Sequence, residues 1–259
     1  MAIKQSVCLP IMVGDEVTNE NLIDWSAEIG FAAVEVWGRE EEFDQICERA
    51  TGLGLRVASF IGHNDIPNGL NDRSSHNRIE QELRASIDVA AERDVPGIIC
   101  FSGNHIPDMS EEEAIANTVA GLNRVASYAE SRGVTLNLEL LNSKIDHIGY
   151  QCDRTSWGRA VVDEVGKPSV KLLYDIYHMQ IMEGDVIRTL LDNLDAIGHI
   201  HTAGVPGREE LDDRQELNYR GICRALSEAG YSGYMGHEFR PRGDTREALE
   251  SAFERCSVG

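Results

Sequence analysis

The sequence predicts a (β/α)8 barrel, the TIM-barrel fold of the α/β class, formed by a single domain over residues 1–259. The chain has 259 residues, close to the roughly 250 residues that are typical of this barrel. Eight short apolar runs alternate with longer stretches of helical period, and no linker or low-complexity tract interrupts them. A doubly wound open sheet is the alternative, but no GxGxxG motif follows the first predicted strand.

The first four βα units are predicted from apolar runs that alternate with helical periods. The expected strands cover residues 6–13, 32–37, 56–62 and 97–102. Thr18 or Asn19 can cap the first helix, and Gly30 can end it. The second helix is expected to hold the acidic residues 40–42 in its first turn, where the helix dipole favours negative charge. The third helix follows a polar loop and repeats apolar residues at helical spacing over residues 79–90.

The last four units are predicted in the same way. Their strands are expected at residues 134–141, 170–176, 196–203 and 234–239. Ser110 and Glu113 form a capping-box signature for the helix after the fourth strand, and Gly133 is expected to end that helix. A helix over residues 153–165 follows the fifth strand, and apolar helical faces follow the remaining three. Beyond residue 176 we expect the chain to leave the sixth strand in a loop.

Composition limits the partners and the location of the protein. The chain has 24 basic and 44 acidic residues, so its formal net charge is −20, which opposes binding to nucleic acid or to an anionic membrane. Its six cysteines form no CxxC pair and are expected to be reduced and buried. No apolar stretch has the length of a membrane span or of a signal peptide, so we expect a cytoplasmic protein. A homo-oligomer remains open.

Four residues at the ends of the last four strands have the chemistry of a metal site. They are Glu139, Asp175, His201 and Glu238, separated by 36, 26 and 37 residues. Separations of about one βα unit place them on adjacent strands, at the carboxyl-terminal end where barrel enzymes carry their catalytic groups. Three carboxylates in one small space would repel one another unless a cation lay among them. Oxygen ligands with one imidazole favour Mn²⁺, Mg²⁺ or Co²⁺.

Further polar residues near the same strand ends have open roles. His178 can contact a substrate or cap its strand end, and Arg208 can bind a substrate carboxylate or pair with the acidic residues that follow it. Glu35 is expected in a buried network and Trp37 as a possible pocket wall. His199, one layer deeper than His201, is expected to support the site or the core. The rim-loop residues His63 and His147 can contact substrate or solvent.

Five blocks of sequence resemble the xylose-isomerase-like family of sugar isomerases and epimerases, and within it the hydroxypyruvate isomerases. The blocks lie at residues 98–104, 138–147, 172–185, 201–219 and 236–239. The resemblance implies the same barrel and a divalent metal held by the four strand-end residues. It also implies proton transfer by Glu139 and Glu238 and substrate contacts from His178 and Arg208. The chain departs from the family pattern at Glu209, at Ile148 and in residues 240–242.

The resemblance predicts an isomerase that interconverts hydroxypyruvate and tartronate semialdehyde. A metal bridging the substrate oxygens would stabilise an enediolate, and the two glutamates would remove and return protons. A ketose 3-epimerase or an isomerase of a longer 2-oxo sugar acid is the alternative within enzymes. A metal-dependent nuclease is disfavoured by the net charge of −20. A binding protein without catalysis is disfavoured because all four ligand candidates are present.

Overall fold

The computed structural model describes residues 3–39 and 42–258. The chain divides into two compact units, and each is described by itself. Unit 1 contains residues up to Phe60, Asp185–Leu194 and the chain from Ile200 onward, and unit 2 contains Ile61–Gly184 and Asp195–His199. None of the helices within the described residues is both long enough and apolar enough to cross a membrane.

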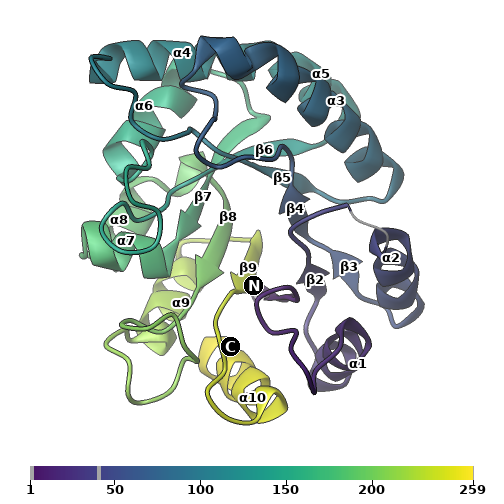
Figure 1. Cartoon of the computed structure of the whole chain (residues 1–259). Coiled ribbons are helices and arrows are strands. Elements are labelled where there is room, and N and C mark those ends of the chain that lie inside the picture. The colour runs from purple at the N-terminus through teal and green to yellow at the C-terminus, as the bar shows by residue number, and fades with distance from the viewer. Residues whose placement is uncertain (1–2, 40–41, 259) are drawn as a thin grey trace. The chain divides into compact units, whose positions relative to one another are not determined.

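Unit 1 is built on parallel strands in the order β3-β2-β1-β9-β8 (Figure 1). The strands are β1 (Lys4–Cys8), β2 (Ala33–Glu35), β3 (Arg56–Val57), β9 (Tyr234–His237) and the end of β8 (Ile197–Thr202). The helices of this unit are α1 (Asn19–Ile29), α2 (Phe43–Gly52), α8 (Val186–Asp192), α9 (Tyr219–Glu228) and α10 (Thr245–Cys256). Helices α1 and α10 pack together. Phe31 lies just beyond the end of α1 and Phe253 lies within α10, and the centres of their rings are 5.0 Å apart.

Unit 2 repeats the pattern on the strand order β7-β6-β5-β4 (Figure 1). Its strands are β5 (Gly97–Cys100), β6 (Thr135–Glu139), β7 (Val170–Asp175), the end of β4 (Ser59–Ile61) and the start of β8. Its helices are α3 (His76–Glu92), α4 (Glu111–Asn123), α5 (Ala126–Arg132), α6 (Thr155–Val165) and α7 (Ile176–Met182). Short 3-10 turns form at η1 (Arg73–Ser75) and η2 (Leu194–Ala196).

The helix ends follow the sequence signals closely. Thr18 caps α1 by accepting a hydrogen bond from the Asn21 amide, and Gly30 ends the helix with a φ of 105°. A left-handed residue at this position suits glycine because it has no Cβ. Ser110 accepts a hydrogen bond from the Glu113 amide at the start of α4, as the capping-box signature predicts. Of the acidic residues 40–42, only Glu42 lies within the described residues, and it immediately precedes α2.

All eight predicted strands are present, but the third is divided into β3 and β4 at Ala58. In unit 1, the Ala58 amide bonds to the Val34 carbonyl and the Ser59 carbonyl accepts from the Val36 amide, so this chain segment pairs with β2. In unit 2, the Gly62 amide bonds to the Ile99 carbonyl of β5. The interruption therefore falls where the chain changes its pairing partner.

Two other predictions were wrong. The helix expected to run to Gly133 breaks between α4 and α5, because the Arg124 and Val125 amides bond three residues back, to Gly121 and Leu122, instead of four. Such a tightened turn ends the α-helical register. The loop expected after residue 176 is the helix α7, and Ile176 is its first residue.

The strand registers determine which side chains share a face. In unit 2, Glu139 pairs with Leu173, so Asp175, two residues further along β7, points to the same side of the sheet as Glu139. In unit 1, Ser6 pairs with both Ala33 and Gly236. Period-two alternation then places Cys8, Glu35 and Glu238 on one face, all at the carboxyl-terminal ends of their strands.

Candidate active site

The imidazole of His201 is held inside unit 1 by a chain of hydrogen bonds. His201 Nε2 lies 3.0 Å from Glu35 Oε2, and the Ser6 hydroxyl donates to Glu35 Oε1 at 2.5 Å. His201 and Glu35 are each 1% exposed. The prediction that Glu35 belongs to a buried network is confirmed. Because Nε2 faces Glu35, the other ring nitrogen, Nδ1, faces Glu238 at 3.4 Å from Oε2.

Gly236 makes room for this pair. A Cβ at position 236 would lie 2.3 Å from Glu35 Oε1 and 2.9 Å from His201 Cδ2. Real Cβ atoms do not approach other atoms so closely, so a larger residue would displace one of the two side chains. The absence of a side chain at position 236 is therefore a requirement for the Glu35–His201 contact.

Glu238 receives hydrogen bonds and charge from three sides within unit 1. The Trp37 indole nitrogen donates to Oε1 at 2.9 Å, and the Arg208 guanidinium forms an ion pair with Oε2, the oxygen that His201 Nδ1 also faces. Glu238 is 5% exposed. Its carboxylate is therefore fixed in orientation by groups from three different loops or strands.

The charges around Glu238 and His201 shift both groups toward their ionised forms. Burial alone would raise the pKa of the Glu238 carboxyl, but the Arg208 guanidinium and His201 outweigh it and hold the pKa well below its ordinary value. Burial would likewise lower the pKa of His201, but the carboxylates of Glu35 and Glu238 raise it well above its ordinary value. The Glu238 carboxylate is thus ionised at neutral pH and able to bind a cation.

Arg208 reaches Glu238 from a loop with an unusual backbone. Its φ of 57° lies in the left-handed region, which costs roughly 1–2 kcal/mol for a residue with a side chain. Arg208 is 9% exposed. Since the surrounding contacts must hold this conformation, the position of the guanidinium depends on the loop around it.

In unit 2, Asp175 and His178 form a second buried group. Asp175 caps α7 by accepting a hydrogen bond from the His178 amide at 3.1 Å, and its other oxygen lies 3.7 Å from His178 Nε2. The Asn142 amide nitrogen lies 2.6 Å from His178 Nδ1. Asn142 donates also to Asp146, which accepts a second bond from the Tyr177 hydroxyl. Asn142 therefore holds the His178 imidazole at Nδ1, and Nε2 faces the Asp175 carboxylate.

Glu139 ends β6 beside the strand that carries Asp175 and is 5% exposed. Its backbone carbonyl accepts a hydrogen bond from the buried Tyr150 hydroxyl at 3.0 Å. The tyrosine fixes the last residue of the strand without using the Glu139 carboxylate. Each unit thus presents two of the four predicted metal ligands, Glu139 with Asp175 and His201 with Glu238.

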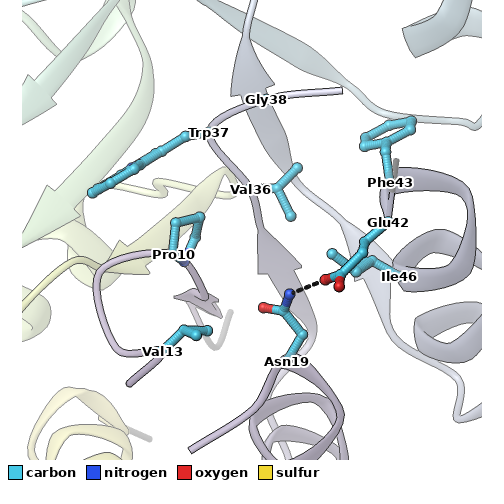
Figure 2. A pocket seen from close by; sticks show the side chains of 9 residues that line it. All are labelled: Pro10, Val13, Asn19, Val36, Trp37, Gly38, Glu42, Phe43 and Ile46. Atoms are coloured by element: carbon cyan, nitrogen blue, oxygen red, sulfur yellow. Dashed lines mark hydrogen bonds between the residues drawn. The ribbon is translucent and has the colours of Figure 1, made fainter. Parts of the chain in front are cut away.

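A cleft of about 500 Å³ in unit 1 extends from Trp37 (Figure 2). Its lining residues are Pro10, Val13, Asn19, Val36, Trp37, Gly38, Glu42, Phe43 and Ile46. Asn19 donates a hydrogen bond to Glu42 at 2.9 Å on one side of the cleft, and Trp37 forms another side (Figure 2). The prediction that Trp37 forms a pocket wall is confirmed, and the same indole contacts Glu238.

The remaining histidines have varied surroundings. His63, expected in a rim loop, is 2% exposed. Its Nε2 accepts a hydrogen bond from the Phe101 amide, and burial lowers its pKa to about 4, so the neutral ring has a structural role. His147 is half-buried, with its ring 5.4 Å from that of His178. His199 is 3% exposed and lies two residues before His201 on β8.

Sequence reasoning gave no role to three residues that shape these groups. Ser6, Asn142 and Gly236 are all at or near strand ends, and each contacts or makes room for a predicted site residue. Ser6 and Asn142 are polar residues in buried surroundings, and Asn142 lies within one of the five family blocks. Buried polar residues near predicted ligands are thus the signal that could have identified two of them.

Comparison with known proteins identifies the family. A family model described as "Xylose isomerase-like TIM barrel" matches residues 23–255. The 2-oxo-tetronate isomerase of Cupriavidus necator is 33% identical over 232 residues, covering 86% of this chain and 88% of the relative. The hydroxypyruvate isomerase of Escherichia coli is 31% identical over 227 residues, covering 87% and 72%. A crystal structure of an AP endonuclease, family 2, from Brucella melitensis has a TM-score of 0.83 and 26% identity, covering 99% and 100%.

These matches confirm the predicted fold class and the prediction of an isomerase. The resemblance to hydroxypyruvate isomerases is also confirmed, because curated relatives with that name or with the name 2-oxo-tetronate isomerase match most of the chain. The single domain over residues 1–259 stays a prediction. On the match over residues 23–255, the chain belongs to the xylose isomerase-like TIM barrel family.

Proposed function

We propose that this protein interconverts hydroxypyruvate and tartronate semialdehyde, with Glu139 and Glu238 transferring the protons. The observation that carries the proposal is the environment of Glu238, an ionised carboxylate held by Trp37 and Arg208 and facing His201. A carboxylate that is buried, ionised and fixed in orientation is suited to remove a proton from carbon. The names of the two relatives support an isomerase of small hydroxy-oxo acids.

The proposal includes one divalent cation, Mn²⁺, Mg²⁺ or Co²⁺, held by Glu139, Asp175, His201 and Glu238. The residues fit such a cation, since the three carboxylates are each at most 5% exposed and buried carboxylates need a compensating charge. His201 fits as a ligand in its neutral form, because Glu35 holds Nε2, a carboxylate–histidine arrangement that orients metal ligands in many proteins, and a cation at Nδ1 would displace the proton from that nitrogen. When bound, the cation would supply electrostatic stabilisation of the negative charge that develops on the substrate oxygens.

The two glutamates divide the proton transfers. In hydroxypyruvate, one carboxylate removes a proton from the terminal carbon C3, leaving an enediolate of the substrate. The other glutamate, in its protonated form, returns a proton to C2, and the proton of the terminal hydroxyl passes to the C2 oxygen. The product, tartronate semialdehyde, has the same atoms and the same oxidation state overall. Trp37 would keep the Glu238 carboxylate aimed at the substrate during this exchange.

Arg208 and His178 complete the proposed substrate contacts. The Arg208 guanidinium can take the substrate carboxylate in a two-pronged contact, which selects a small acid although the chain has a net charge of −20. In the structure its Nη2 contacts Glu238, so Arg208 would share its donors between that carboxylate and the substrate. His178, held by Asn142 and Asp175, can contact a substrate oxygen.

A longer 2-oxo sugar acid is the second candidate substrate. Trp37, which donates to Glu238, also lines the cleft of about 500 Å³, so a longer substrate could extend from the site into that space. The relative from Cupriavidus necator has the name of an isomerase for a four-carbon acid of this kind. No nucleic-acid or membrane partner is proposed, and a cytoplasmic location and a homo-oligomer stay predictions.

A comparison of substrates tests this proposal. The metal-reconstituted protein is given hydroxypyruvate, 2-oxo-tetronate or a ketose, and products are followed by proton NMR before and after addition of a chelator. We expect hydroxypyruvate to be converted and the conversion to stop on chelation. Faster conversion of 2-oxo-tetronate would move the proposal to the longer acid. If only a ketose is turned over, with exchange of its C3 proton, the proposed isomerase activity would be replaced by that of a ketose 3-epimerase.

A further inference from the structure

Three carboxylates follow Arg208 directly in the chain and compete for its guanidinium. Glu209, Glu210 and Asp212 all lie within four residues of it. An arginine next to such a cluster would ordinarily fold back onto it, because opposite charges at short range attract strongly. The Arg208 guanidinium forms an ion pair with Glu238, 30 residues further along the chain. The charge of the cluster is met by a second arginine.

Arg242 forms ion pairs with these three carboxylates. Its Nε lies 2.8 Å from Glu209 Oε2 and 3.4 Å from Glu210 Oε1, and its Nη2 lies 3.0 Å from Asp212 Oδ2. The Arg242 amide also donates to the second Glu210 oxygen at 3.0 Å. Arg214 adds contacts to Glu210 and Asp212 at 3.3 and 2.6 Å, but it does not contact Glu209. The negative charge of Glu209, the residue next to Arg208, is therefore neutralised by Arg242.

The backbone joins the same two segments. The Arg240 amide donates to the Arg208 carbonyl at 2.8 Å, and Glu209 forms β-bridges with both Arg240 and Gly204. The loop of residues 204–212 is thus attached to residues 240–242, which begin two residues after Glu238. This attachment accounts for how Arg208 keeps its left-handed backbone, with a φ of 57°.

The ion pair of 2.8 Å between Arg242 and Glu209 lies next to Arg208 in the chain. An acidic residue next to Arg208 would by itself draw the guanidinium away from Glu238. Arg242 provides the matching positive charge.

We propose that Arg242 is a positioning residue that neutralises Glu209, Glu210 and Asp212 and so keeps Arg208 directed at Glu238 and at the carboxylate of the substrate. This inference rests on the proposed function for the role of Arg208 in substrate binding. Arg242 contacts neither Glu238 nor the substrate. Its effect is expected in KM, because Arg208 binds a part of the substrate that does not react.

The test compares Arg242→Gln with Arg246→Gln. Arg246 is a matched control, since it is similarly exposed and forms ion pairs with Glu28 and Glu250 on α1 and α10, outside this cluster. For Arg242→Gln we expect KM to rise about fivefold, on the order of what the loss of two or three half-exposed ion pairs produces, with a smaller change in kcat through the contact of Arg208 with Glu238. Arg246→Gln should keep the wild-type KM. Equal KM values in the two variants would overturn the proposal.

A rescue variant separates positioning from general damage to the loop. In the double variant Arg242→Gln/Glu209→Gln, the neighbouring carboxylate that competes for Arg208 is gone, so KM should return toward the wild-type value. In Arg242→Lys, KM should stay close to the wild-type value, because lysine keeps the positive charge. A double variant no better than Arg242→Gln would show that Arg242 does not act by neutralising Glu209.

Hydrogen exchange gives a readout that does not need turnover. The amides of Gly204 and Arg240 bond to the Glu209 and Arg208 carbonyls, so Arg242→Gln should speed their exchange several-fold while Arg246→Gln should not. If the wild-type protein converts no hydroxy-oxo acid, the proposed function fails, and faster exchange would still support the attachment of the loop. Unchanged exchange together with unchanged KM would contradict the inference itself.

Discussion

His201 and Glu35 share a buried hydrogen bond of 3.0 Å between Nε2 and Oε2, although 166 residues separate them in the chain. The contact orients the imidazole so that Nδ1 faces Glu238. A ligand that is held in this way binds a cation without first losing rotational freedom. Glu35 is thus the residue on which the orientation of the proposed ligand His201 depends.

Glu35→Gln should weaken divalent-metal binding. The glutamine keeps the size of the side chain but removes the charge that holds the imidazole, and loss of such a partner typically lowers metal affinity about 10- to 100-fold. Titration calorimetry of the metal-free protein with Mn²⁺ measures the change. Glu28→Gln, at an exposed carboxylate on α1, is the control and should bind Mn²⁺ as the wild type does. Equal Mn²⁺ affinity in the two variants would show that Glu35 does not support metal binding.

Gly236→Ala should damage the same pair by steric contact. The new Cβ would lie 2.3 Å from Glu35 Oε1, and such overpacking typically costs about 1–3 kcal/mol of stability. We expect a lower free energy of unfolding in denaturant titrations and weaker Mn²⁺ binding. Gly14→Ala is the matched control, because nothing lies within 4 Å of a Cβ at that position. A Gly236→Ala protein with wild-type stability and metal affinity would contradict the packing described for Glu35 and His201.

Trp37→Phe should reduce kcat. The phenyl ring retains an aromatic wall for the cleft but cannot donate to Glu238, and a hydrogen bond to a charged group is typically worth about 1.5–3 kcal/mol. A decrease in kcat on the order of tenfold is expected in steady-state kinetics with the preferred substrate. Trp25→Phe, in α1, should leave kcat unchanged. If Trp37→Phe raises KM alone, the indole contributes to substrate binding and not to the orientation of Glu238.

Stability should fall as the pH is lowered from about 6.5 toward 4. Burial lowers the pKa of His237 to about 3 and that of His63 to about 4. The unfolded chain takes up protons at these residues near their ordinary pKa of about 6.5, and the folded chain does not. Protonation therefore favours unfolding within this window, and the stability is fully present above it.

Denaturant titrations across this pH range check the expectation. Each of the two histidines should contribute about 1.4 kcal/mol per pH unit to the slope. His237→Gln should lower the slope, while His105→Gln, at an exposed position, should not. His237 accepts from Thr202 and donates to Gln5, so the variant is compared by its slope and not by its absolute stability. A slope that is the same in both variants would show that His237 does not remain neutral in the folded protein.

The strand-end residues could be predicted from sequence because parallel strands have a regular period. Glu139 and Asp175 follow buried apolar runs, and the register places both on one face of the sheet. The helix α7 could not be predicted in this way. Its apolar residues continue the buried run of β7, and only the side chain of Asp175, which caps α7, marks the change from strand to helix.

The partners of the site residues were less accessible to sequence reasoning. The acidic neighbours of Arg208 were candidates because they are close in the chain, but its observed partner is Glu238. Whether Arg208 pairs with its acidic neighbours in the chain depends on which other group neutralises them. That group includes Arg242, which lies 30 residues from Asp212 in the chain. Similarly, Asn142 and His178 are 36 residues apart, and only the packing of the folded chain brings them to 2.6 Å. Contacts of this kind depend on tertiary structure and not on a local pattern.

The most direct test of the central claim is deuterium incorporation from D₂O into hydroxypyruvate, followed by proton NMR with the wild-type protein and with Glu139→Gln and Glu238→Gln. The wild type with Mg²⁺ should convert hydroxypyruvate to tartronate semialdehyde with deuterium at C2. Each variant should remain folded and lose turnover, because one of the two proton transfers has no carboxylate to carry it. Conversion at near wild-type rates in either variant would contradict the two-glutamate mechanism.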